Sequence, residues 1–171
     1  MKNSKISFPV VAVLGLQPVK PQHSRAPLEE RLPDRFTLHK AQLFDAPVAE
    51  AVSTKPFGHW DWPLRYATPE LALLELASEG KQNSDFDVLD KLFESATSLR
   101  PQLLMKQLKA CHHVKAKRLF LWFAERHGFA WFKRLEFEVV NLGSGKRVIV
   151  KGGKLDKNYL ITVPREMSTP S

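Results

Sequence analysis

Three adjacent residues, Cys111, His112 and His113, have side chains that could hold a metal ion or act in nucleophilic catalysis. Thiolate and imidazole are zinc ligands, but adjacent helical residues point about 100° apart, and no second cluster supplies further ligands. A nucleophilic cysteine would also need a positioned base and an oxyanion hole, which no neighbouring motif indicates. We therefore interpret Cys111 as a core residue and predict no metal site and no cofactor.

The glycine-rich motif Gly143-Ser-Gly145, followed by Lys146 and Arg147, superficially resembles a phosphate loop. A P-loop needs four residues between its glycines, a Gly-Lys-Ser/Thr ending and a following helix. Here a strand-like run follows, so an NTPase site is excluded. Two interpretations stay open. The motif is a tight hairpin turn with solvated basic side chains, or it contacts phosphate through Lys146, Arg147 and backbone N–H groups.

A group of carboxylates in the middle of the chain could suggest metal-dependent catalysis. The group consists of Asp85, Asp87, Asp90 and Glu94. These residues fall in the first turns of a predicted helix, where the helix dipole alone favours negative charge. We interpret them as helix-stabilising and, in the absence of a catalytic motif, expect a protein that is not an enzyme and has no catalytic residues.

Positive charge is concentrated in the second part of the chain. The 171 residues have a formal net charge of +8 and an ordinary globular composition, with 43% hydrophobic residues. Residues 1–99 contain 11 Lys/Arg and 13 Asp/Glu, a net charge of −2, whereas residues 100–171 contain 15 and 5, a net charge of +10. Such an asymmetry indicates a polyanionic or acidic partner, the alternative being a merely solvated basic face.

Cations and aromatic residues alternate through residues 106–134, as they do on many nucleic-acid-binding surfaces. Aromatic residues at helical spacing are more often core, so we expect Phe120 and Phe123 to be buried. Lys115, Lys117 and Arg118 are then expected to face solvent. The candidate residues for binding a nucleic acid or another partner are the cations of this region and of the following loops: Lys106, Lys109, Lys115, Lys117, Arg118, Arg126, Lys133, Arg134, Lys146, Arg147, Lys151 and Lys154.

Helix signals lie between residues 68 and 128. Thr68 is a favourable N-cap, and the helix that it begins should end at Gly80. Ser84 resembles the first residue of a capping box, and Pro101 is suited to the first position of a third helix. The fourth helix should run over Val114–His127 and end at Gly128.

Strand signals flank these helices, so the order strands, helices, strands indicates an α+β fold. It comprises an N-terminal β-rich part, a central group of about four helices and short C-terminal antiparallel strands. The aromatic segment 56–63 is expected to pack its two tryptophans against the body. The predicted strands are residues 6–16, 36–44, 137–142, 147–151 and 159–163.

The length of the chain suits one domain, and its single cysteine excludes an internal disulfide. The apolar run Ile6–Leu16 is much shorter than the ~20 residues of a membrane span, and no signal cleavage site follows it. We interpret the run as a buried strand. We expect a cytoplasmic protein with no membrane partner, monomeric rather than oligomeric.

Six segments of the chain resemble the C-terminal domain of AbiEi-type antitoxins: Phe57–Leu64, Thr68–Leu76, Val114–Gly128, Asn141–Arg147, Lys151–Asp156 and Tyr159–Pro164. These antitoxins belong to bacterial type IV toxin–antitoxin systems, which also act in phage defence by abortive infection. The resemblance implies an antitoxin that neutralises a nucleotidyltransferase toxin encoded alongside. It assigns residues 55–166 to the antitoxin domain. We expect residues 1–54 to be a β and loop part of the same domain and residues 167–171 to be a loose tail.

Residues 1–54 depart from the family pattern. Family members typically have an N-terminal winged helix-turn-helix that represses their own operon, whereas this region is broken by prolines and lacks closely spaced amphipathic helices. We therefore expect a truncated or stand-alone antitoxin, with sequence-specific operator recognition in doubt. The predicted partner is the toxin system. The alternative is a DNA-binding accessory protein or regulator that acts through its basic C-terminal part.

Overall fold

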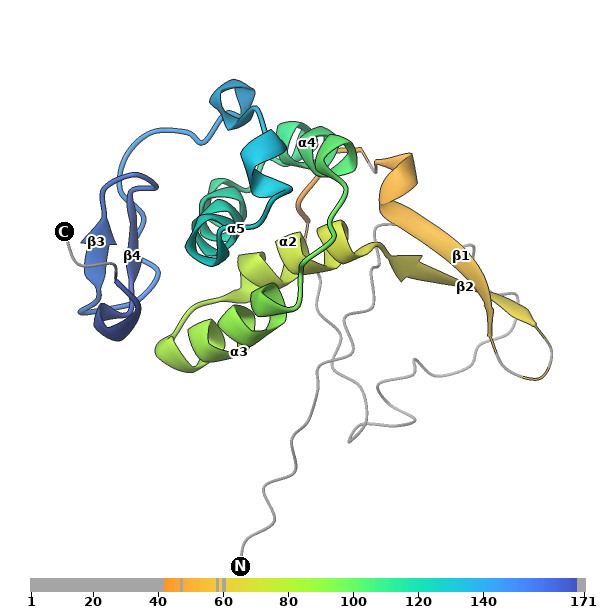
Figure 1. Ribbon diagram of the computed structural model, residues 1–171, viewed down its shortest axis with the longest axis horizontal. Coiled ribbons are helices and arrows are strands. Elements are labelled where there is room, and N and C mark those ends of the chain that lie inside the picture. Colours follow the sequence, from red (N-terminus) through yellow and green to blue (C-terminus); the bar gives the residue numbers. More distant parts are fainter. Residues whose placement is uncertain (1–41, 47, 58, 60, 169–171) are drawn as a thin grey trace, which may run out of the picture.

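Four helices form the centre of the computed structural model (Figure 1). The structure describes residues 42–46, 48–57, 59 and 61–168. The helices are α2 (Pro69–Glu79), α3 (Asn83–Glu94), α4 (Pro101–Ala110) and α5 (Val114–His127). This arrangement, together with short antiparallel strands, confirms the predicted α+β class. Of the strands predicted at 6–16 and 36–44, the first lies outside the described residues, and of the second only 42–44 are described.

The ends of the helices follow from local sequence. Thr68 has an extended backbone before Pro69 in α2, and Gly128 ends α5 with a left-handed φ of 62°. Helix α3 differs in detail from the prediction, because its N-cap is Gln82 rather than Ser84. The Asp85 carboxylate accepts hydrogen bonds from the backbone N–H groups of Lys81 and Gln82, at 2.8 and 3.2 Å. The capping box thus begins two residues earlier than expected.

The hydrophobic core is built around α5, which is buried without interruption from Ala116 to Ala124. Phe120 and Phe123 are both fully buried, as predicted. They pack on Phe93 of α3, with ring centroids 5.1 and 5.0 Å from it. A second link is the Trp131 indole, which donates a hydrogen bond of 2.7 Å to the Ala96 carbonyl. Helix α5 therefore has neighbours on every side. None of the helices in the described part of the chain is long and apolar enough to cross a membrane.

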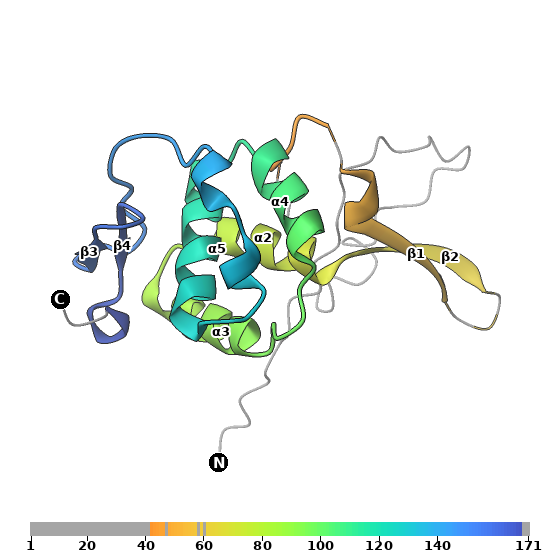
Figure 2. The same ribbon diagram turned by 45° about the horizontal axis from the view of Figure 1, so that its top comes forward.

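A two-stranded hairpin precedes the helices. Strand β1 (Val52–Phe57) pairs antiparallel with β2 (Trp62–Ala67), from Val52 opposite Ala67 to Phe57 opposite Trp62. Figures 1 and 2 show it extending from the helices on the side opposite to the C-terminal strands. The two tryptophans of segment 56–63 are predicted to pack against the rest of the domain. Their side chains lie outside the part of the chain that the structure describes.

The C-terminal segment has less strand structure than the sequence predicts. Residues 137–142 contain the short 3-10 helix η3 (Phe137–Val139) instead of a strand. In the 147–151 segment only Arg147 forms a bridge, parallel to Ile161. The two regular strands here are β3 (Lys154–Asp156) and β4 (Ile161–Val163), which pair antiparallel. The predicted three-strand arrangement is wrong because side chains, described below, take the carbonyl groups that a strand ladder would need.

Helix α2 carries two buried carboxylates with different environments. Burial disfavours ionisation of Glu70, but hydrogen bonds from the Arg100 side chain and backbone outweigh it and hold the pKa of Glu70 at about 2. The two guanidinium contacts measure 3.0 and 3.1 Å and join the start of α2 to the start of α4. Glu75 is 8% exposed, and its Oε2 has no hydrogen-bond partner. Burial raises the pKa of Glu75 to about 7.

Glu75 should make the fold less stable as pH rises. Its folded-state pKa of about 7 lies above the ordinary 4.5, so its contribution is complete below pH 4.5 and is lost as pH rises through 7. We expect Glu75→Gln to increase the free energy of unfolding at pH 8 by about 3 kcal/mol, with little change at pH 4.5. Urea unfolding at both pH values measures this difference. An equal effect of the substitution at both pH values would contradict it.

Candidate functional site

The predicted binding cations do not form one continuous surface. Lys117 and Arg118 of α5 lie in the interior, between two exposed groups. One exposed group is on α4 and on η2 (Phe132–Arg134), and the other is on the C-terminal segment, which Figure 1 shows on the opposite side of α5 from α4. The exposed cations of the first group are Lys106, Lys109, Lys133 and Arg134; those of the second are Lys146, Arg147, Lys151 and Lys154.

The prediction that the start of α5 faces solvent is wrong for two of its three cations. Lys117 is 4% exposed and Arg118 is 1% exposed. Lys115 is half-buried, and its Nζ donates a hydrogen bond of 3.1 Å to the Ser78 carbonyl. The physical reason is that α5 is the central helix, so its polar positions are also covered. Lys117 and Arg118 therefore hold the structure together in this fold and are not on its surface.

Arg118 binds backbone carbonyl groups from two separate loops. Its guanidinium donates to Leu142 at 2.8 Å, to Gly143 at 3.0 Å and to Gly145 at 2.6 Å. A fourth contact, of 3.3 Å, reaches the carbonyl of Leu160, next to β4. Arginine suits this position because its planar group directs five N–H donors in fixed directions. One side chain thus fixes the loop before Arg147 against the last strand.

Lys117 adds a second buried cation, and its Nζ donates to the Asn141 carbonyl. Burial lowers the pKa of both Lys117 and Arg118, and the neighbouring Arg147 lowers that of Arg118 further. No carboxylate among the described residues forms a salt bridge with either cation. Their positive charge is therefore met by the dipoles of neutral carbonyl groups.

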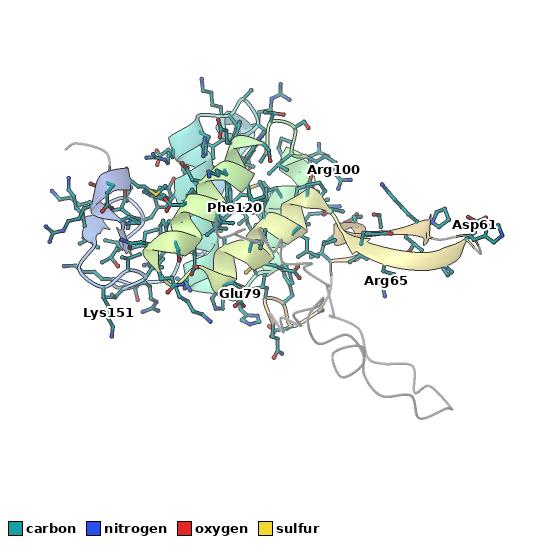
Figure 3. All side chains as sticks on the ribbon, turned by 90° about the horizontal axis from the view of Figure 1, so that it is seen from below. Asp61, Arg65, Glu79, Arg100, Phe120 and Lys151 are labelled. Atoms are coloured by element: carbon teal, nitrogen blue, oxygen red, sulfur yellow. The ribbon has the colours of Figure 1, made fainter. Side chains whose placement is uncertain are left out.

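We call residues 139–168 the basic lobe. From Val139 to Leu155 the sequence contains four Lys/Arg residues and no Asp or Glu. Of the two acidic residues in the lobe, Asp156 is already engaged, because it accepts from the Trp122 indole at 3.1 Å and from the Tyr159 N–H at 2.9 Å. Figure 3 shows Lys151 at the end of the molecule opposite to Asp61 of the hairpin. Exposed cations in a stretch of sequence without Asp or Glu make the basic lobe the best candidate for binding an anionic partner.

Two of the other predicted cations are partly neutralised. Lys106 forms a salt bridge of 2.7 Å with Glu50. Arg126 contacts Asp90 at 3.2 Å, donates to the Met167 carbonyl at 2.9 Å and lies over the Trp122 ring. These contacts connect elements of the fold, so both residues are weaker candidates for partner binding.

The residues of the remaining motifs make contacts within the fold. Cys111 is a buried free thiol, and burial raises its pKa, which opposes nucleophilic chemistry. The Nδ1 of His113 accepts a hydrogen bond from the Ala116 N–H at 3.2 Å and so caps α5. Asp85 caps α3, while Asp90 binds Arg126 and lies 3.0 Å from His127. Among the described residues no three His, Cys, Asp or Glu side chains could together hold a metal ion.

Sequence reasoning missed the inward orientation of Arg118, although one signal was present. Residues 119–124 are six consecutive apolar residues, which cover the whole circumference of a helix. A helix that is apolar all round is a buried helix, and the turn before such a run is then also covered. No comparable sequence signal indicates which groups the guanidinium binds, because Leu142 and Leu160 are far from Arg118 in the chain.

One family model, described as "Transcriptional regulator, AbiEi antitoxin, Type IV TA system", matches residues 27–164. The match covers most of the chain and confirms the resemblance found in the sequence. It begins earlier than the resemblance, which we placed from residue 55 onward. No curated protein and no solved structure gives a significant match.

Arg118 should be among the most important polar side chains for stability. Arg118→Lys keeps the charge, but its single ammonium cannot reach carbonyls from both loops. We expect the free energy of unfolding to fall by about 3 kcal/mol, since each hydrogen bond to a buried charged group is worth roughly 1.5–3 kcal/mol. Urea unfolding of Arg118→Lys beside the exposed control Arg134→Lys checks this. A decrease in the free energy of unfolding below about 1 kcal/mol would show that hydrogen bonds from water to these carbonyls replace those from Arg118.

Proposed function

Because the chain belongs to the AbiEi antitoxin family of transcriptional regulators from type IV toxin–antitoxin systems, we propose that it neutralises a nucleotidyltransferase toxin through its basic lobe. The family match over residues 27–164 is the observation that carries this proposal. Membership also argues for a binding protein, because antitoxins and regulators of this kind are generally not enzymes. The identity of the toxin as a nucleotidyltransferase comes from the sequence resemblance.

The lobe suits recognition of an acidic surface on the toxin or on the target of the toxin. Lys146, Arg147 and Lys151 are exposed, and the stretch that holds them contains no acidic residue. The buried hydrogen bonds of Arg118 tie this stretch to α5, so little flexibility would be lost on binding. Lys117 and Arg118 contribute through the fold, and we assign them no direct contact with a partner.

Neutralisation should depend on the lobe more than on the α4 side. We expect the wild-type chain to relieve growth arrest when it is co-expressed with the nucleotidyltransferase encoded beside its gene. Lys146→Glu/Arg147→Glu/Lys151→Glu should abolish most of this relief, because three charges are reversed on the proposed surface. The matched control Lys109→Glu/Lys133→Glu/Arg134→Glu reverses three exposed charges elsewhere and should retain it. Colony counts at equal soluble levels of each antitoxin give the result.

Failure of the wild-type chain to relieve toxicity would refute the antitoxin proposal. Equal relief by both triple variants would refute the assignment to the lobe. Thermal unfolding of the purified variants separates loss of binding from loss of fold, since all six substituted residues are exposed.

A second candidate function is DNA binding, which is favoured by the net charge of +10 on residues 100–171. Phosphate contacts release counterions, so the logarithm of affinity for duplex DNA should fall linearly with the logarithm of salt concentration, by about 0.9 per phosphate contacted. Fluorescence anisotropy with a labelled duplex at several salt concentrations measures the slope. A flat response would exclude an electrostatic DNA interface.

A further inference from the structure

The loop Asn141–Arg147 presents backbone N–H groups on the side opposite to Arg118. The carbonyls of Gly143 and Gly145 are both directed at the Arg118 guanidinium. In a trans peptide the N–H of the next residue points opposite to the carbonyl, and the described residues contain no cis peptide. The N–H groups of Ser144 and Lys146 must therefore point away from α5. Within the part of the chain that the structure describes, neither N–H has a hydrogen-bond partner.

Two glycines allow this backbone path. Gly143 and Gly145 have φ values of +64° and +75°, which other residues rarely adopt. A side chain at position 143 would also lie 3.0 Å from the Val114 methyl group. Backbone N–H groups that emerge in this way on one side of a glycine turn form a concave site for anions.

The electrostatic surroundings favour an anion at the same place. Lys146 and Arg147 are exposed and belong to the loop itself, and Ser144 adds an exposed hydroxyl group. Beneath the loop lie the buried charges of Lys117 and Arg118, whose hydrogen-bond partners among the described residues are carbonyls of this segment and of Leu160. No acidic residue occurs between Val139 and Leu155 to oppose an anion.

We propose that the loop Gly143–Arg147 binds a phosphate oxyanion. The donors are the N–H groups of Ser144 and Lys146 and the side chains of Lys146 and Arg147, while Arg118 is a positioning residue that orients the peptides from behind. A phosphate group suits this set because its several oxygens can accept from backbone and side-chain donors at once. The site does not depend on the antitoxin proposal.

Phosphate could reach this loop from a nucleic-acid backbone or from a free nucleotide, and we assign it to the nucleic-acid backbone. The positive charge continues beyond the loop to Lys151, which is exposed on the same lobe. A backbone supplies successive phosphates to such a row of cations, whereas a free nucleotide places its phosphates at one point only.

The site can be tested by a 1H–15N NMR titration of the full chain with inorganic phosphate at constant ionic strength, using chloride to balance the salt. We expect saturable shifts centred on the amides of Ser144 and Lys146. Lys146→Ala/Arg147→Ala should weaken binding about tenfold, because two charge-assisted contacts are removed. The matched control Lys133→Ala/Arg134→Ala removes two adjacent exposed cations from η2 and should leave the affinity unchanged.

Two further titrations identify the source of the phosphate. A short DNA duplex should shift the same amides at much lower concentration than phosphate does, and GTP should act only like phosphate. Tighter binding of GTP than of the duplex would overturn the assignment to a nucleic-acid backbone. Shifts that spread over all exposed cations, or equal losses in both double variants, would overturn the loop site itself. The spectra also show directly whether each variant is folded.

Discussion

Helix α5 imposes the main constraint on this fold, because nine consecutive residues, Ala116–Ala124, are buried. The apolar part of this run is covered by aromatic and aliphatic side chains from the other helices. The first turns also contain Lys117 and Arg118, whose charges cannot be left in the interior without partners. Backbone carbonyls of the C-terminal segment provide these partners. The burial of one helix thus decides where a distant segment must lie.

The C-terminal segment is consequently held by side chains more than by strand pairing. Arg118 joins its first loop to Leu160, and the Trp122 indole binds Asp156. The hydroxyl group of Thr162 accepts from the N–H groups of Ile149 and Val150, at 2.8 and 3.1 Å. With so many backbone groups taken by side chains, only short strands form. The same contacts turn the exposed cations of the basic lobe outward, where a partner can reach them.

Helix α2 shows how strongly a partner changes the behaviour of a buried carboxylate. Glu70 and Glu75 lie on the same helix and are both more than nine-tenths buried. Arg100 supplies hydrogen bonds to Glu70 and keeps it ionised, whereas Glu75 lacks such a partner and binds its proton near neutral pH. Burial alone does not predict the charge state, because the deciding contact comes from a residue 30 positions away.

Local sequence determined the class of the fold, the bounds of α2 and α5, the start of α4, and the family, because capping residues, helical periodicity and motifs act over a few residues. It also indicated a basic C-terminal part. Only the tertiary structure decided which of those cations are available. Lys117 and Arg118 were expected on the surface but lie inside, since the neighbours that cover α5 are distant in the chain. The predicted strand at 137–142 is absent for the same reason: the carbonyls of Asn141 and Leu142 accept hydrogen bonds from α5, a helix more than 20 residues earlier in the chain.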